Sequence, residues 1–224
     1  MRPGRAWLRG AAMLAAMALF AACSSGPPVP DWQTNTKGAM DRATAAYLRG
    51  DTRIAQAEYE VARRELARTG RADLLARAAL MRCAARVASL DIGPCAEFEP
   101  LRADAAAPER AYADYLAARV QPQDVVLLPP QHRAVATASA NDAEAALRRI
   151  DDPLARLVAA GVLFQSARAS PATIGLAADT ASEQGWRRPL LAWLQVQATL
   201  AEKAGDTAEA ERLRRRIAVV QGGA

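Results

Sequence analysis

One histidine, three cysteines and one pair of adjacent aspartates are the residues whose types could support catalysis or metal binding. His132 could act as a general base or as a zinc ligand, but both roles need partners. The 224 residues contain no second histidine and no HExxH spacing, so the usual nitrogen ligands of a zinc site are missing. We expect His132, which follows a proline pair at the start of a predicted helix, to be a surface or capping residue.

The aspartate pair Asp151-Asp152 stands directly before Pro153. An aspartate at a helix N-cap accepts a backbone hydrogen bond and complements the helix dipole, and proline is favoured in the first turn. Capping therefore explains this pair without catalysis. The chain also lacks the G-x-S-x-G, P-loop and G-x-G-x-x-G motifs of common hydrolases and nucleotide-binding proteins. We predict no catalytic, cofactor-binding or metal-binding residue.

Cys83 and Cys95 are candidates for a disulfide if the protein is exported, because exported proteins meet an oxidising environment. A helix that continues from Cys83 to about residue 91 carries the chain ~12 Å away. The four steps to Cys95 can return at most ~14 Å, so the chain must reverse at once. Gly93-Pro94 is a plausible turn. The alternative is two unpaired thiols, with Cys83 filling an apolar stripe.

The N-terminus has the organisation of an export signal. Arg2, Arg5 and Arg9 precede an apolar stretch over residues 11–22, which is shorter than the ~20 residues of a membrane-spanning helix. The LFAACSSG segment around Cys23 resembles the lipobox of bacterial lipoproteins, although Phe20 stands where leucine is usual. This resemblance implies cleavage after residue 22 and lipid attachment to Cys23.

Two other interpretations of this N-terminus remain. Ordinary signal peptidase could cut after Ala18, because Ala16 and Ala18 are small residues at the required spacing, and an unmodified Cys23 could follow a short helix. Removal of residues 1–22 leaves 26 of the 29 basic residues against 24 acidic residues, a balance of +2. The pI of about 9.5 therefore describes the precursor, and we expect no nucleic-acid partner.

The remainder of the chain predicts one all-α domain. Residues 23–30 are small and proline-rich, which is typical of a tether. Apolar residues then recur at helical spacing between glycine, aspartate and proline breaks. The VVLL segment lies between prolines and has no partner strand, so we predict no sheet. About nine helices are expected, over 31–49, 52–69, 71–90, from 108, 131–150, 153–166, 171–184, 188–204 and 207–220.

Two features of the C-terminal helices are more simply explained by structure than by binding. Arg214-Arg215-Arg216 lies in the last turns of the final predicted helix, where cations complement the dipole. Contact with anionic lipid or cell-wall polymer is the alternative. Trp186 and Trp193 flank the start of the preceding helix, and we expect both to be core residues rather than a binding platform.

The segment YLRGDTRIAQAEYEVAR resembles the second half of a tetratricopeptide repeat (TPR). Gly50 stands at the turn, and Ala55, Tyr59 and Ala62 occupy the small, aromatic and small positions. A second segment, at 193–217, matches less well because Arg214 takes the aromatic position. The two cover about a quarter of the chain, without a clean 34-residue period. The resemblance implies a TPR-like stack of antiparallel helical hairpins, an α-α superhelix over residues 31–224, with a concave surface for peptides or partner helices.

These features together predict a non-enzymatic lipoprotein of the outer membrane of a Gram-negative bacterium, facing the periplasm. Ser24 after the cysteine resembles the signal for transfer to the outer membrane. Lipoproteins of similar build serve as pilus pilotins, barrel-assembly components and activators of wall synthesis, which implies an envelope protein as partner. The alternatives are a peptidoglycan-acting enzyme on an α-superhelical scaffold and a structural envelope protein without a fixed partner.

Overall fold

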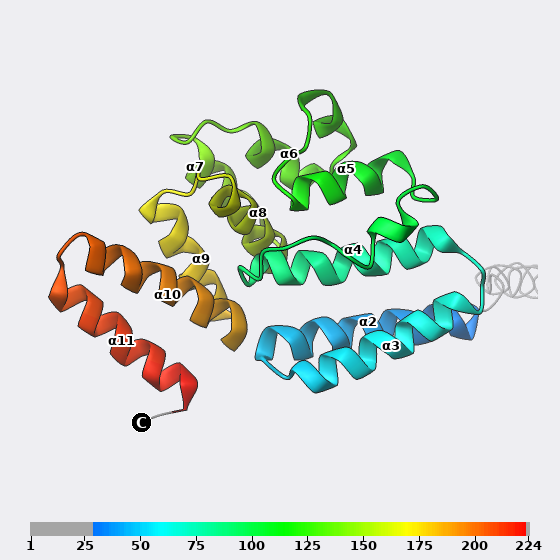
Figure 1. Ribbon diagram of the computed structural model, residues 1–224, viewed down its shortest axis with the longest axis horizontal. Coiled ribbons are helices and arrows are strands. Elements are labelled where there is room, and N and C mark those ends of the chain that lie inside the picture. The colour runs from blue at the N-terminus through cyan, green and yellow to red at the C-terminus, as the bar shows by residue number, and fades with distance from the viewer. Residues whose placement is uncertain (1–28, 223–224) are drawn as a thin grey trace, which may run out of the picture.

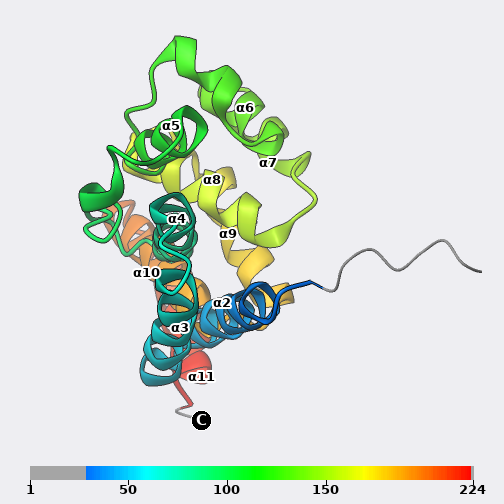
Figure 2. The same ribbon diagram turned by 90° about the vertical axis from the view of Figure 1, so that its right-hand side faces the viewer.

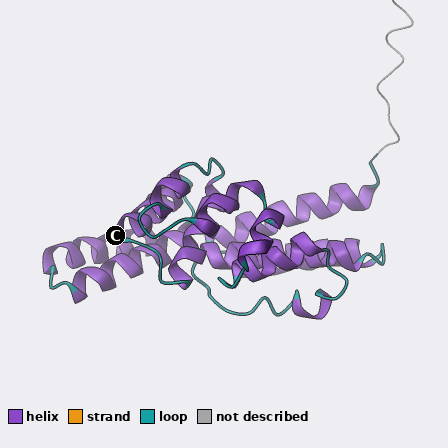
Figure 3. Cartoon of the chain, turned by 90° about the horizontal axis from the view of Figure 1, so that it is seen from above, coloured by secondary structure: helices purple, strands orange, loops and turns teal. Residues whose placement is uncertain are grey.

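The computed structural model describes residues 29–222. Within this range the regular structure is entirely helical, in ten α-helices and two short 3-10 helices, and no strand occurs. This confirms the expected all-α class. The expected signal at 1–22, Cys23 and the tether up to residue 28 lie outside the described residues. Seen from above, the described chain consists of helices joined by loops (Figure 3).

The first two helices form an antiparallel hairpin, α2 (Asp31–Arg49) and α3 (Thr52–Ala67). Gly50 ends α2 with φ of 99°, a left-handed conformation that glycine adopts at little cost. Ala55, Tyr59 and Ala62 are buried on the inner face of α3, and the small side chains of the two alanines allow a close approach to α2. The hairpin and α4 share a small apolar cluster that is separate from the main core.

The centre of the molecule is α4 (Ala72–Ala88), which packs against α8 (Pro153–Gln165). The two helices cross so closely that a Cβ on Gly161 would lie 2.3 Å from the carbonyl oxygen of Val87. Only glycine fits this crossing without a shift of the backbone. The main core surrounds the crossing and is built mostly from alanine, leucine and valine.

The region between α4 and α8 contains short elements: η1 (Glu99–Leu101), α5 (Ala107–Leu116), η2 (Pro122–Leu127), α6 (Pro130–Thr137) and α7 (Ala143–Arg148). The single helix expected over 131–150 is wrong, because the chain extends at Ala138 (ψ 141°) and turns before α7. In that turn Ser139 Oγ donates to Asp142 Oδ2 at 2.6 Å. The VVLL segment lies in η2 and the residue after it, so its prolines start a 3-10 turn rather than a strand.

The C-terminal part contains α9 (Pro171–Glu183) and a second long hairpin, α10 (Arg187–Lys203) with α11 (Thr207–Gln221). Asp152, Ser170 and Asp206 cap their helices by accepting a backbone N–H. Trp193 is fully buried, and its Nε1 donates to the carbonyl of Ala88 at 3.1 Å, which fixes α10 to the end of α4.

Figure 1 shows α4 across the middle of the molecule, with the α2–α3 hairpin below it and α5 and α6 above it. The chain returns through α8 and α9 to the α10–α11 hairpin at the left. Figure 2 shows α2 and α6 on the same side of α4. In this arrangement α4 contacts α2, α3, α5 and α8, yet part of its surface stays open.

Candidate functional site

A groove follows the open stripe of α4. It consists of three hollows that share Met81, with volumes of about 450, 500 and 480 Å³. The first lies toward the start of α2, the second toward α5 and η2, and the third toward α6 and the start of α8. We call the whole the α4 groove; its floor is formed by residues spaced three or four apart along the helix, Leu74, Arg77, Ala78, Met81 and Ala84.

Met81 is the centre of the α4 groove. Its side chain is 47% exposed, whereas the neighbouring Leu80 and Ala78 are 3% exposed. A flexible, polarisable thioether adapts to differently shaped apolar partners, and methionine is common on surfaces that bind peptides. An exposed methionine at the junction of three hollows therefore suits a binding surface better than a core position.

The third hollow is acidic. Of the residues that line it, the charged ones are Asp41 of α2 and Asp152 at the start of α8. Asp152 Oδ1 accepts from the backbone N–H of Ala155 at 2.6 Å, which fixes the carboxylate at the helix end. Asp41 Oδ2 lies 2.6 Å from Lys37 Nζ in an exposed ion pair. Exposed pairs of this kind are weak and exchange partners readily.

His132 lies at this end of the groove, and the expectation of a surface or capping residue is wrong. Its side chain is only 2% exposed, and Nδ1 lies 3.4 Å from the hydroxyl of Tyr115. The imidazole ring also lies 5.7 Å from the ring of Tyr112, centroid to centroid. Burial lowers the pKa of His132 to about 4, against the opposing field of Asp152, so the imidazole is neutral near pH 7.

Glu109 of α5 lines the second hollow. Its Oε1 accepts from Arg77 Nε at 2.6 Å, and its side chain is 12% exposed. The other oxygen, Oε2, is buried without a hydrogen-bond partner among the described residues, and so is Thr36 Oγ1 beside the first hollow. Unpaired buried polar atoms are costly, so water or a bound group with matching donors fits here.

Several carboxylates outside the groove have lowered pKa values. In each case a hydrogen bond from an arginine is the main cause of the lower pKa. The pairs are Arg86 with Asp91, Arg102 with Glu99, and Arg42 with Glu58. Each shift therefore comes from an ion pair on the surface. Such pairs favour the ionised carboxylate, which is the opposite of what a general acid needs.

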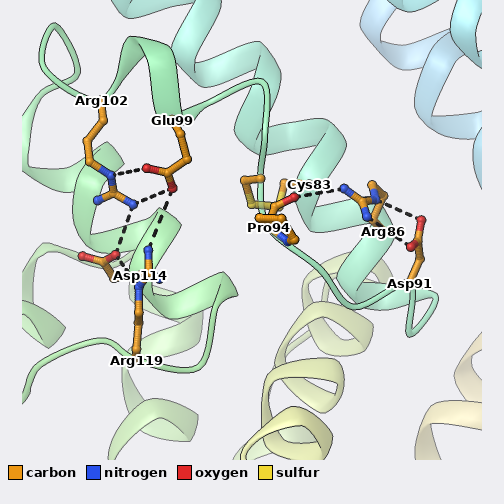
Figure 4. The surroundings of a disulfide bond; sticks show 9 residues. Cys83, Arg86, Asp91, Pro94, Glu99, Arg102, Asp114 and Arg119 are labelled. Atoms are coloured by element: carbon orange, nitrogen blue, oxygen red, sulfur yellow. Dashed lines mark hydrogen bonds and ion pairs between the residues drawn. A yellow bond between two sulfur atoms is a disulfide. The ribbon is translucent and has the colours of Figure 1, made fainter.

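Cys83 and Cys95 are joined by a disulfide, with their Cα atoms 5.7 Å apart. Arg86 holds the intervening loop: its Nε and Nη2 donate to Asp91 and its Nη1 donates to the carbonyl of Pro94 (Figure 4). The chain thus reverses within the loop that contains Gly93-Pro94. A second ionic cluster, Arg102, Glu99, Asp114 and Arg119, lies on the far side of the disulfide.

The loop closed by the disulfide also contacts the N-terminal hairpin. Tyr47 Oη donates to Asp91 Oδ2 at 3.2 Å, and burial raises the pKa of Tyr47 to about 12. Arg188 of α10 stacks on the same ring, 4.2 Å from its centroid. A cleft of about 320 Å³ lies among these residues and the disulfide. Tyr47 therefore joins three segments that are distant in the sequence.

The residues assigned to repeat packing and the two tryptophans of the C-terminal part lie in different parts of the fold. Gly50, Ala55, Tyr59 and Ala62 lie in the turn and inner face of the α2–α3 hairpin, with Arg82 above the Tyr59 ring at 4.6 Å. Trp193 is a core residue. Trp186 is partly buried: it packs against the edge of the main core and also borders the third hollow.

Two arginines of the C-terminal run Arg214-Arg215-Arg216 form ion pairs, one with the neighbouring helix and one within the same helix. Arg214 Nη2 lies 2.6 Å from Glu202 Oε1 of α10, and Arg215 lies 4.0 Å from Glu211.

Sequence reasoning missed the roles of Met81, Glu109 and Arg188. The helical spacing of Leu74, Ala78 and Met81 is a signal for an apolar face, whereas nothing near Glu109 or Arg188 in the sequence signals their distant partners.

No known protein family, curated protein or solved structure matches the chain. Among residues 29–222, no three side chains of histidine, cysteine, aspartate or glutamate lie together as metal ligands would. None of the helices in the same range has both the length and the apolarity that crossing a bilayer requires.

Proposed function

We propose that this chain is a non-enzymatic lipoprotein of the outer membrane whose periplasmic domain binds another envelope protein in the α4 groove. The observation that carries the proposal is the exposed Met81, around which three hollows with mainly apolar surfaces adjoin. Helical scaffolds bind extended peptides or partner helices in surfaces of this kind.

A TPR-like arrangement of the hairpins is part of the proposal. It is supported by the turn at Gly50-Asp51 and the similar turn at Gly205-Asp206, where both glycines have positive φ values of 99° and 74°. The short α6 and α7 depart from the regular helix lengths of such repeats. We therefore propose a TPR-like character for the two terminal hairpins rather than a uniform array.

The lipid anchor is proposed from the sequence around Cys23. Eight tether residues, 23–30, reach at most ~28 Å when extended, so the domain would stay close to the membrane. The test is mass spectrometry of the mature N-terminus together with membrane fractionation. We expect an acylated Cys23 in the outer membrane, and neither an acyl chain nor transfer to the outer membrane in the Cys23→Ser variant. A mature protein that begins at Leu19, without lipid, would contradict the anchor.

Partner binding is tested by photo-crosslinking in cells that produce the protein. A benzophenone amino acid replaces Met81 in the groove or Ile54 on α3, which is 51% exposed and outside the groove. We expect a discrete crosslinked partner from position 81 and none from position 54. The same bands from both positions, or no band from position 81, would contradict a groove-specific partner and favour a structural envelope protein.

A peptidoglycan-acting enzyme is the second candidate, and the observation that favours it is Glu109. This glutamate lines a hollow of about 500 Å³ and has one buried oxygen without a partner among the described residues. The test compares release of wall fragments from purified peptidoglycan by the wild type and by Glu109→Gln. Turnover that the substitution abolishes would establish the enzyme; the proposed scaffold role requires no turnover in either protein.

A further inference from the structure

The acidic third hollow differs in charge from the molecule around it. The chain after residue 22 has a balance of +2, yet the charged residues lining this hollow are Asp41 and Asp152. His132 beside them is neutral near pH 7. The second hollow is lined by Arg77 and Arg133 as well as Glu109, and the first by Lys37, Arg71 and Arg77 as well as Asp41. Of the three hollows, only the third has acidic lining residues and no lysine or arginine.

We propose that this hollow binds a cationic, apolar peptide segment of the partner: a lysine or arginine between Asp41 and Asp152, with an adjoining apolar side chain against Met81 and Trp186. The proposal rests on the proposed function, because it assigns the chemistry of the segment that the α4 groove would bind. The two carboxylates come from different elements, α2 and the start of α8, and both line the hollow.

The carboxylates are arranged to accept a cation from outside the chain. Asp152 is held by its bond to the Ala155 N–H, and among the described residues it has no ion pair. Asp41 pairs with Lys37, whose side chain is 80% exposed. An incoming ammonium or guanidinium group can replace Lys37 at small cost, since an exposed pair contributes little. Burial of the hollow by the bound peptide would then strengthen both contacts.

The apolar residues that line the third hollow indicate which side chains should accompany the cation in the bound peptide. Leu48, Ala84, Leu154, Val158 and Trp186 surround the carboxylates, and Tyr112 continues into the second hollow. The volume of about 480 Å³ falls within the ~300–1,000 Å³ of ordinary ligand pockets. A lysine or arginine side chain suits such a site, because its apolar stem packs against the lining while its charged end meets the carboxylates.

The experiment is a selection from a random 12-residue peptide library on the mature, unlipidated chain, followed by affinity measurements on the selected peptides. We expect enrichment of lysine or arginine beside leucine, isoleucine, phenylalanine or tryptophan. Asp41→Asn and Asp152→Asn should each weaken binding about fivefold, and the double variant more strongly. Affinity should also fall with added salt.

The chain offers matched controls. Asparagine preserves N-capping, so Asp152→Asn should keep α8 intact. Asp206→Asn makes the same change at the N-cap of α11, and Asp31→Asn makes it elsewhere on α2; both should leave affinity unchanged. Thermal unfolding of each variant checks that the fold is retained.

Three outcomes would overturn the inference: selection of acidic or uncharged peptides, equal affinity in the double variant, or no enrichment. If position 81 still crosslinks a partner in cells, only the cationic chemistry is wrong. If position 81 also fails to crosslink, the proposed function fails with it.

Discussion

Arg188 Nε donates to the backbone carbonyl of Tyr47 at 2.7 Å, across 141 residues of sequence. The same guanidinium donates through Nη2 to Thr52 Oγ1 at 2.6 Å and stacks on the Tyr47 ring. The contact joins the C-terminal hairpin to the N-terminal hairpin. Because α2 is one wall of the α4 groove, Arg188 also helps to set the position of that wall.

Arg188→Ala should lower the free energy of unfolding by about 1–3 kcal/mol, because it removes two charge-assisted hydrogen bonds and a cation–π contact. Hydrogen exchange should accelerate in α2 and α3 more than in α8. Arg187→Ala is the control, since Arg187 donates only to the exposed carbonyl of Gln221, at 3.2 Å, and should change stability by no more than about 0.5 kcal/mol. Equal exchange rates in both variants would show that Arg188 does not hold the hairpin.

Gly161→Ala should destabilise the fold by about 1–3 kcal/mol or more, because the added methyl group would overlap the carbonyl of Val87 where α4 and α8 cross. Gly175→Ala provides the comparison within α9. The atom nearest to its added Cβ is Gln197 Nε2 at 3.9 Å, so the better helix propensity of alanine should stabilise by up to ~1 kcal/mol. Denaturant unfolding measures both changes, and similar effects at the two positions would contradict the close crossing.

Reduction of the disulfide should cost about 3 kcal/mol in the chain-entropy model, because Cys83 and Cys95 are 12 residues apart. The Cys83→Ala/Cys95→Ala double variant should show the same loss in urea unfolding and should no longer respond to a reducing agent. Mass spectrometry under non-reducing conditions counts the free thiols. Free thiols at both Cys83 and Cys95 in wild-type protein isolated without a reducing agent would contradict the bond.

Acidification should destabilise the protein through His132. The folded-state pKa of about 4 lies below the ordinary 6.5, so the unfolded chain binds more protons between these values. The stabilisation is complete above pH 6.5 and is lost as the pH falls toward 4, by about 3 kcal/mol in total. His132→Gln should flatten this part of the profile of unfolding free energy against pH. If the wild type and His132→Gln show the same slope of unfolding free energy between pH 4.5 and 6.5, His132 is not buried in its neutral form.

The helix boundaries were largely predictable from the sequence, because glycine, aspartate and proline mark most of them. Asp152 caps the helix that it was expected to cap, and Ser170 caps α9 in the same way, directly before a proline. The expected helix over 131–150 failed because apolar spacing alone does not reveal that Ser139 and Asp142 form a turn. His132 was misjudged because its burial depends on Tyr115, whose position follows from the packing of α5 and not from the residues beside His132.

The candidate site was less predictable than the fold. Leu74, Ala78, Met81 and Ala85 recur at helical spacing in the sequence, and α4 is contacted by α2, α3, α5 and α8. Whether neighbours cover a given residue depends on the angles between helices, and those angles depend on contacts such as Gly161 with Val87. The open stripe and its acidic end therefore became visible only when the helices were placed in space.

The attachment of the α2–α3 hairpin has a mechanical consequence. The hairpin is held by a small apolar cluster separate from the main core, by the Tyr47–Asp91 hydrogen bond and by the guanidinium of Arg188, so we expect it to yield to force more easily than the helices around the main core. The C-terminal hairpin thus acts as a brace for a wall to which it contributes no lining residue beyond Trp186. A chain ending at Trp186 would keep every lining residue of the groove, but it would lose the Arg188 contact and the core side chains that α10 and α11 supply, Trp193 among them.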